Sequence, residues 1–410
     1  MGFIPEKIKD EIYLNTKGIP QISADSLQRK YINGLSYYFR EMTIINAPFV
    51  NYYPFKYRRK IVSAYEYTSI VNNCQVDVKS LSFRTTPFSY SKDRESLLYD
   101  ELKHWIETRE DEHTIIIIYS VHLPFMKACE RIKKEYQYIK LIHIIPDFPE
   151  FMNSSSKLLS VLHHKISLLL TKRTCNRLYK IMDGFVYITK YMANYNKTFN
   201  KPYVIIEGIA NGSKRISSSS SEKGKYIFYS GTMAEKYGIK LLVDAFLKIK
   251  HKDYELLLCG SGDSVDYITG LCNNKIKYLG VLDNEAVLAY QRNATLLVNP
   301  RTNEGEFVKY SFPSKILEYF SSGTPTLMYR LDGVPDDYYE FCFEAKSMSP
   351  EGLAQEIDRL LNKESEEIEV VGEKAAEFVQ NKKSAKFQCN KIIHLIKAIA
   401  NCESTPLYLQ

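Results

Sequence analysis

The residues best suited to chemistry lie in three short segments of the second half of the chain. Residues 231–233 (GTM) and 260–263 (GSGD) are glycine turns that would let the backbone approach a phosphate closely, although many such turns are only turns. In 311–318 (SFPSKILE), a predicted helix begins near Pro313. Its unpaired N–H groups, its dipole and the Lys315 ammonium would hold a diphosphate. Glu318, one turn deeper, can accept two hydrogen bonds from vicinal hydroxyls such as those of a ribose.

Other polar residues stand near these segments. Lys236 comes soon after the first glycine turn and is either a cation at the same crevice or a surface lysine. Glu304 and Glu306 precede the helix, in a loop that could bend over a ligand. His122 follows a predicted strand, where a neutral imidazole could bond to a ligand, or could be an ordinary loop histidine.

The elements that position these residues form an alternating pattern. Apolar strands alternate with helices of about ten residues, which predicts a doubly wound parallel sheet. In such a sheet, ligands bind beyond the carboxyl ends of the strands. The expected strands are 226–230, 255–259, 276–281, 295–298 and 324–329; the expected helices are 238–250, 264–272, 284–294 (with Asp283 as N-cap) and 313–322 (with Gly323 as its stop).

The first half shows the same alternation less clearly. Strands are expected at 115–120, 140–146, 185–188 and 203–206, with a helix at 125–136. Residues 211–225 contain five consecutive serines and indicate a solvated linker. We therefore predict an N-terminal domain of residues 1–210 and a C-terminal domain of 226–384. The amphipathic end, 385–410, could pack on either domain.

Composition excludes several classes of protein. The chain has 410 residues, 45% of them hydrophobic and 25% charged, which fits two or three globular domains. The longest apolar runs are far too short to span a membrane, and no export signal is visible, so we expect a cytoplasmic protein. The eight cysteines form no C-x-x-C pair, which argues against a disulfide framework and a zinc site.

Charge is concentrated in one segment. Residues 157–180 combine leucines at helical spacing with many cations. A basic amphipathic helix could contact an anionic surface such as the inner face of the plasma membrane, or could be a core-facing helix with a solvated basic face. Nucleic acid is disfavoured, because no binding motif accompanies the charge.

Residues 226–330 resemble the donor-nucleotide domain of GT-B glycosyltransferases of family 4, the glycosyl transferases group 1, of the bacterial polysaccharide-assembly type. The motifs are YSGTMAEKYGIKLLVDAF, LLLCGSGD and KYSFPSKILEYFSSGTPTL. The resemblance implies an α/β GT-B fold: two doubly wound, Rossmann-like domains facing each other across a cleft. The family has two glutamates eight positions apart. Glu318 matches the second, which binds the ribose, but Tyr310 stands at the first.

The resemblance also implies roles for individual residues. Thr232 stands where the family has an arginine, and Tyr237 rather than a lysine precedes Gly238, so Lys236 would replace these cations in part. The sugar contact then falls to Glu306, Glu304 or the backbone. The implied donor-binding set is Gly231, Thr232, Lys236, Gly260, Ser261, Gly262, Ser311, Phe312, Pro313, Ser314, Lys315 and Glu318. The implied catalytic residues are His122, Glu306 and Lys315, and Asp147 and Glu150 would position the acceptor.

The implied reaction moves a sugar from a nucleoside diphosphate sugar to an acceptor hydroxyl with retention of configuration. Cations and N–H dipoles would stabilise the leaving diphosphate. The sequence contains no D-x-D triplet, which favours a site that needs no metal or other cofactor. A lipid-linked saccharide of capsular, exopolysaccharide or O-antigen synthesis is the expected acceptor. The alternatives are a noncatalytic nucleotide-sugar-binding partner subunit, a GT-B nucleotide-sugar epimerase and, last, a phosphorylase.

Overall fold

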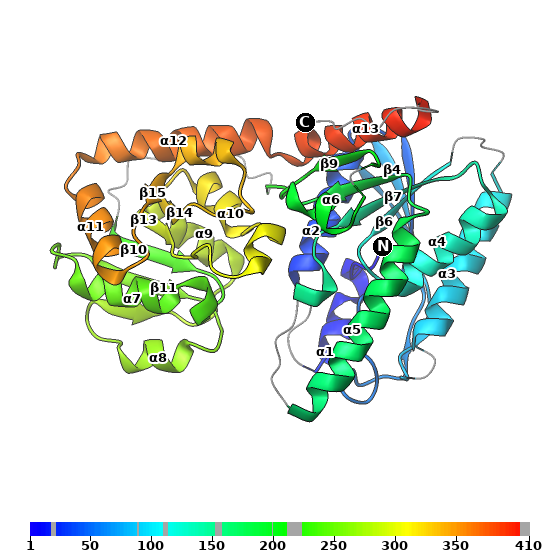
Figure 1. Ribbon diagram of the computed structural model, residues 1–410, viewed down its shortest axis with the longest axis horizontal. Coiled ribbons are helices and arrows are strands. Elements are labelled where there is room, and N and C mark those ends of the chain that lie inside the picture. Colours follow the sequence, from blue (N-terminus) through cyan, green and yellow to red (C-terminus); the bar gives the residue numbers. More distant parts are fainter. Residues whose placement is uncertain are drawn as a thin grey trace. The chain divides into compact units, whose positions relative to one another are not determined.

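The computed structural model describes residues 1–17, 22–87, 90–109, 114–151, 158–198, 200–210 and 224–401. The chain divides into two compact units (Figure 1). Unit 1 comprises Met1–Ile209 and the chain from Ala385 onward, and unit 2 comprises Ala210–Ser384. Residues 211–223 of the predicted linker lie outside the described residues, and the first strand of unit 2 begins at Gly224, not at Tyr226.

Unit 2 is built on a parallel six-stranded sheet. The strands are β10 (Gly224–Ser230), β11 (Glu255–Cys259), β12 (Ile276–Tyr278), β13 (Ala294–Asn299), β14 (Thr326–Tyr329) and β15 (Phe343–Ala345). Their order in space is β12-β11-β10-β13-β14-β15, and every neighbouring pair is parallel. The order reverses between β10 and β13. The doubly wound sheet predicted from the sequence is confirmed.

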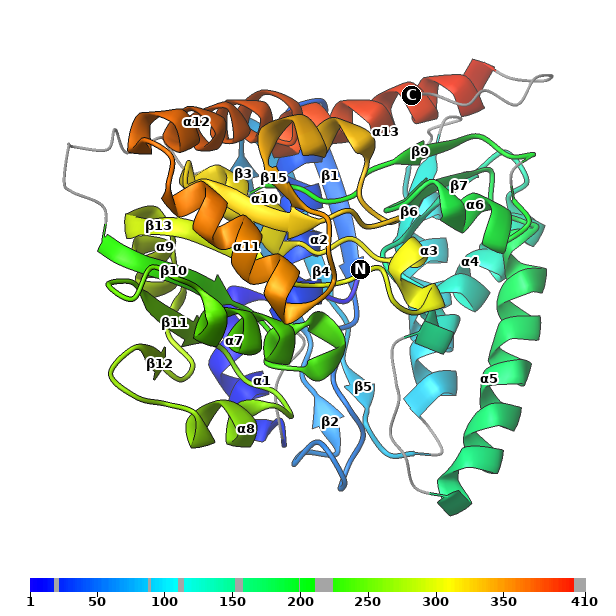
Figure 2. The same cartoon turned by 60° about the vertical axis from the view of Figure 1, so that its left-hand side comes forward.

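Helices cover both faces of this sheet because neighbouring strand residues point to opposite sides. Ile227 packs in one apolar cluster with α7 and α11, and Phe228 packs in another with Tyr319. Figure 2 shows α7 and α11 side by side. The Asp283 side chain caps α9, accepting a hydrogen bond from Ala286 N at 2.8 Å, as predicted. The elements are η3 (Glu235–Tyr237), α7 (Ile239–Lys248), α8 (Val265–Gly270), α9 (Asn284–Asn293), η4 (Glu306–Tyr310), α10 (Lys315–Ser322), η5 (Asp336–Phe341), α11 (Pro350–Leu361) and α12 (Ser365–Lys382).

Unit 1 contains a parallel four-stranded sheet in the order β6-β7-β8-β9. Its strands are β6 (Ile115–Tyr119), β7 (Lys140–Ile145), β8 (Gly184–Tyr187) and β9 (Tyr203–Ile205), close to the predicted ranges. A second sheet has the order β1-β4-β3, with β4 parallel to β1 and antiparallel to β3. The remaining strands are β1 (Glu41–Asn46), β2 (Ile61–Val62), β3 (Tyr65–Val71), β4 (Cys74–Ser80) and β5 (Phe83–Arg84).

Helices complete unit 1: η1 (Glu6–Ile8), α1 (Lys9–Asn15), α2 (Ile22–Leu35), α3 (Tyr90–Glu107), α4 (Leu123–Glu135), η2 (Pro149–Phe151), α5 (Leu158–Tyr179), α6 (Tyr191–Tyr195) and α13 (Ala385–Asn401). The last helix, α13, packs against α2 and the four-stranded sheet, through Ile392 and Leu395 among others. Gly34 of α2 permits this contact, since a Cβ there would lie 2.3 Å from the Cys389 sulfur. Helix α13 therefore belongs to the core of unit 1.

Helix α5 covers the basic segment 157–180 but corrects one expectation. It is only weakly amphipathic, and Leu169 and Leu170 are exposed, at 60% and 57%. Apolar side chains are therefore not confined to a core-facing side. In the part of the chain that the structure describes, no helix is both long enough and apolar enough to cross a membrane.

Candidate active site

The reversal of strand order places two loops of unit 2 beside each other. The loop after β10 begins at Gly231, and the loop after β13 begins with Pro300 and Arg301. Gly238 brings the loops into contact: its φ is +79°, and a Cβ there would lie 2.0 Å from the Pro300 carbonyl oxygen. Ligands of doubly wound sheets bind at such a point of reversal. The candidate site lies here.

The two predicted glycine turns are packed against each other. Gly231 N donates to Cys259 O, and Met233 N donates to Ser261 O, each at 2.9 Å. A Cβ on Gly260 would lie 1.8 Å from the Gly231 oxygen, and one on Gly262 would lie 2.2 Å from the Met233 oxygen. The close approach that demands glycine at 260 and 262 is therefore that of the neighbouring loop. The structure brings the two turns together and gives Gly260 and Gly262 a structural reason to be glycine, while phosphate binding by the turns stays a prediction.

A hydrogen bond ties helix α10 to the end of strand β10. Ser230, the last residue of that strand, donates its N–H to the Tyr319 hydroxyl oxygen at 2.9 Å. Tyr319 thereby fixes the helix beside the first glycine turn. The predicted helix start at Pro313 is two residues early: α10 begins at Lys315, and the Ser314 side chain does not cap it.

The first turn of α10 carries the two predicted ligand-binding side chains. Lys315 Nζ donates to Glu318 Oε2 at 2.7 Å, and the two side chains are 38% and 25% exposed. Ser311 and Phe312 precede the helix, and Phe312 is buried against Tyr338. Glu304 and Glu306 are both exposed on the segment that leads to α10.

Arg301 is a site residue that the sequence reasoning missed. Its guanidinium lies 5.0 Å from the Phe307 ring centroid and 5.4 Å from that of Tyr237. Arg301 Nη2 donates to Ser311 Oγ at 2.6 Å. Arg301 is only 6% exposed, its Nε is buried without an acceptor, and burial lowers the pKa of its guanidinium. The only signal in the sequence is its place, two residues after the end of a strand.

Lys236 lies at the same two rings. Its ammonium is 5.1 Å from the Tyr237 centroid and 6.0 Å from the Phe307 centroid. We call Lys236 and Arg301 the cation pair. Lys236 is exposed, whereas Arg301 is buried. Lys236, which was predicted, and Arg301, which was not, therefore lie at the same two aromatic rings beyond the ends of β10 and β13.

In unit 1, His122 precedes α4, just beyond the end of β6. Its ring packs against both Phe49 and Phe125, with centroids 5.1 and 4.6 Å away. Arg94 Nη1 lies 3.4 Å from His122 Nε2, and Nδ1 is buried without a partner. Burial, followed by the Arg94 charge, holds the pKa of His122 well below its usual range. The imidazole is neutral near pH 7.

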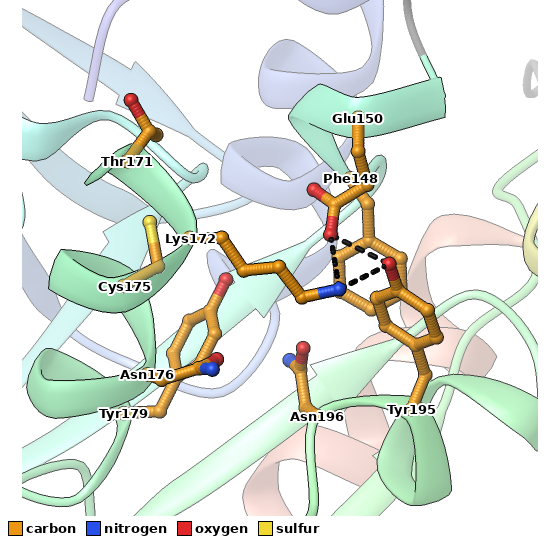
Figure 3. A pocket seen from close by; sticks show the side chains of 9 residues that line it. All are labelled: Phe148, Glu150, Thr171, Lys172, Cys175, Asn176, Tyr179, Tyr195 and Asn196. Carbon is orange, nitrogen blue, oxygen red and sulfur yellow. Dashed lines mark hydrogen bonds and ion pairs between the residues drawn. The ribbon is translucent and has the colours of Figure 1, made fainter. Parts of the chain in front are cut away.

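Two acidic residues follow β7. Asp147 is exposed, yet the protein around its carboxylate desolvates it and raises its pKa to about 6. Glu150 lines a small pocket (Figure 3). There it accepts a hydrogen bond from the Tyr195 hydroxyl at 2.7 Å, and Lys172 Nζ lies 3.4 Å from it. Lys172 also donates to Tyr195 Oη at 2.8 Å, so Glu150 belongs to a three-residue cluster that the sequence did not predict.

No group of three or more His, Cys, Asp or Glu residues that could hold a metal ion occurs within the described ranges. The cysteines whose surroundings are described are free thiols.

Known proteins resemble this chain in sequence and in fold. Residues 224–363 match the model of the family described as "Glycosyl transferases group 1". An uncharacterized glycosyltransferase of Methanocaldococcus jannaschii is 25% identical over 146 residues, which are 34% of this chain and 36% of that protein. The chain thus matches about a third of that relative's length.

Two solved structures share the fold over nearly the whole chain. Sucrose-phosphate synthase from Thermosynechococcus elongatus superposes with a TM-score of 0.58 at 13% identity, covering 92% of this chain and 93% of that one. The trehalose-6-phosphate protein of E. coli bound with UDP-2-fluoro glucose gives a TM-score of 0.59 at 10% identity, covering 93% and 98%.

The architecture of the chain is therefore the GT-B fold of these structures. The segment that matches a family model, residues 224–363, is similar to the group 1 glycosyltransferases. The predicted resemblance to group 1 glycosyltransferases is confirmed for these residues.

Proposed function

We propose that the protein transfers a sugar from a nucleoside diphosphate sugar to an acceptor hydroxyl. One observation carries the proposal: the first turn of α10, with Lys315 and Glu318, is anchored by Tyr319 to the end of β10, where the strand order reverses. This turn lies inside the segment that matches the family model. Glu318 would accept hydrogen bonds from the ribose hydroxyls. Lys315 and the helix start would face the diphosphate.

The chemistry follows from charge. Breaking the bond between the sugar and the diphosphate leaves negative charge on the diphosphate and positive charge on the sugar. Preorganised cations lower this barrier most at the leaving oxygen. In this proposal Lys315 leaves Glu318 and turns to the diphosphate when the ribose takes its place, and neither a metal nor another cofactor is needed. Glu306 or Glu304 would contact the sugar, with retention of configuration.

Unit 1 would supply the acceptor side. His122 is neutral and can exchange hydrogen bonds with the sugar or the acceptor hydroxyl without carrying charge. Asp147, just beyond β7, would accept a hydrogen bond from the acceptor. Glu150 would act together with Lys172 and Tyr195 rather than alone.

A lipid-linked saccharide of polysaccharide synthesis is the acceptor class that we propose. Support comes from α5, where exposed Leu169 and Leu170 adjoin Lys172 and Arg173. Exposed leucines beside cations suit the surface of an anionic bilayer. Cosedimentation should therefore be stronger with vesicles containing anionic lipid than with neutral vesicles, and weaker for Leu169→Ser/Leu170→Ser. Equal binding to both vesicles would argue against membrane contact.

Calorimetry in the presence of EDTA tests the donor assignment. UDP-, GDP-, ADP- and TDP-sugars are titrated into the full chain, and the donor that binds is then incubated with candidate lipid-linked saccharides. We expect one donor to bind without metal and a transfer product whose anomeric configuration, read by NMR, matches that of the donor. If no donor binds, with or without Mg²⁺, the proposal is wrong.

A noncatalytic nucleotide-sugar-binding subunit is the second candidate. It is favoured by Tyr310, which occupies the position where the family resemblance implies a glutamate. The same experiment separates the two functions. Binding of a donor without transfer to any acceptor, and without slow hydrolysis of the donor, would favour the binding subunit.

A further inference from the structure

We infer that Arg301, together with Lys236, forms the binding site for the diphosphate group of the ligand. The inference rests on the proposed function and assigns its main phosphate contact to a residue outside α10. The cation pair holds two positive charges over the same two rings, Tyr237 and Phe307, beyond the carboxyl ends of β10 and β13. Each charge is held by ring contacts rather than by a carboxylate within 4.0 Å in the described residues.

The cation pair lacks a counter-charge in the protein. Within the described ranges, no carboxylate lies within 4.0 Å of the Lys236 ammonium or of the Arg301 guanidinium. The nearby Glu235 is paired with Lys240 instead. Repulsion between two positive charges at the same two rings raises the free energy of the folded protein, and a bound anion would offset this repulsion.

Burial makes this arrangement costly for Arg301. Arg301 is only 6% exposed. The acceptor for its Nη2 is a neutral hydroxyl, Ser311 Oγ. The buried Nε has no acceptor at all. A buried guanidinium with unmade hydrogen bonds is an expensive feature that a phosphate oxygen would satisfy. A diphosphate suits the site because the planar guanidinium can bind two phosphate oxygens in parallel.

Helix α10 does not supply this charge by itself. Lys315 is paired with Glu318, so the first turn carries no net side-chain charge in the absence of ligand. The cation pair therefore provides the positive charge that is uncompensated before a ligand arrives. It acts on the diphosphate, and Glu318 acts on the ribose.

Variants of Arg301 test the assignment. Arg301→Met keeps much of the aliphatic volume, and Arg301→Gln keeps a hydrogen-bond donor without the charge. The probes are inorganic pyrophosphate, which carries no base, UDP with GDP, ADP and TDP, and the nucleosides alone. We expect both variants to weaken binding of pyrophosphate and of the preferred nucleoside diphosphate about 10- to 100-fold, with nucleoside affinity unchanged.

A stability measurement separates binding from structure. Because the buried charge has no carboxylate beside it in the described part of the chain, the ligand-free Met variant should melt at the same temperature as the wild type or higher. Arg330→Gln is the matched control: Arg330 also follows a strand and stacks on a ring, Tyr339, but it is exposed and paired with Asp336 and Glu344. It should leave all three affinities unchanged.

Each outcome decides between the proposals. If nucleoside diphosphates bind and the Arg301 variants bind them equally well, the Arg301 assignment is overturned while the donor proposal stands. If only pyrophosphate binds, and Arg301→Met loses it, the anion site stands and the donor proposal fails. A wild type that binds neither overturns both. A Met variant that does not fold, while Arg301→Gln folds and binds normally, marks Arg301 as structural.

Discussion

Lys315 and Glu318 form an ion pair of 2.7 Å within the first turn of α10. The two side chains to which the sequence assigned the diphosphate and the ribose are thus bonded to each other in the absence of ligand. Both are partly exposed, and an ion pair of this kind contributes only about 0–1 kcal/mol, so a ligand can break it at little cost. Donor binding is then an exchange of partners at a preformed helix start.

Glu318→Gln should weaken binding of the preferred nucleoside diphosphate about 10- to 100-fold, because a neutral amide replaces an acceptor-only carboxylate at the ribose. Calorimetry measures the loss, and pyrophosphate binding should change much less. Glu351→Gln is the control. Glu351 lies in the first turn of α11 and is also paired with a lysine, Lys248 of α7. Wild-type affinity in Glu318→Gln would remove the ribose assignment.

His122→Ala should lower turnover about 10- to 100-fold while donor affinity stays within a factor of two, because the imidazole bonds to reacting groups rather than to the nucleotide. Because the pKa of His122 is low, titration of this residue should not change the rate between pH 6.5 and 8. Steady-state kinetics measure both effects. His251→Ala serves as the control, and equal turnover in the two variants would refute the role.

Asp147 should introduce a pH dependence. Desolvation by the surrounding protein raises its pKa to about 6 from about 3.9 in an unfolded chain, so the carboxylate takes up a proton as the pH falls through 6. If the ionised form holds the acceptor, kcat/KM of the wild type should fall below pH 6. In Asp147→Asn, kcat/KM should be low at every pH and should not show this fall. The sign for stability is opposite. Ionised Asp147 disfavours folding above pH 6, so the asparagine variant should be at least as stable at pH 7.

Gly238→Ala should destabilise unit 2 by about 1–3 kcal/mol, since the left-handed φ and the Pro300 oxygen both exclude a Cβ. Nucleotide affinity should fall as well, because the loop carrying Lys236 must shift. Thermal melting and calorimetry give the two values. Gly270→Ala is the matched control: nothing lies within 4 Å of its Cβ position, so its stability should match or exceed the wild type.

Unit 2 could be predicted closely because its parallel strands are buried on both faces. Ile227 and Phe228 both face a core, so the strand appears as a continuous apolar run, and Asp283 and Gly323 mark helix ends by their side-chain type. The strands of the first 110 residues escaped prediction. In β3, exposed and half-buried residues alternate, which gives a weak apolar signal. Asn72 and Asn73, both with positive φ, were the available sign of a hairpin.

The candidate site was predictable where one short segment carries it. The Lys315–Glu318 turn has a local signature, because residues three apart on a helix are neighbours. Arg301 has none. Its role depends on the Tyr237 ring, which is distant in sequence and is brought close only by the reversal of strand order. Lys172 and Tyr195 were missed because they are 23 residues apart in the sequence and meet only in the folded chain, where Figure 3 shows them together.

The return of α13 to unit 1 has a consequence for biosynthesis. Its side chains Cys389, Ile392, Leu395 and Ile399 complete an apolar cluster with strands that leave the ribosome some two hundred residues earlier. Unit 2 is contiguous and can fold as soon as it is made. Unit 1 keeps an apolar surface uncovered until unit 2 and then α13 have been synthesised. The domain made first is thus the one finished last, and a nascent chain halted before residue 385 exposes the surface that α13 covers.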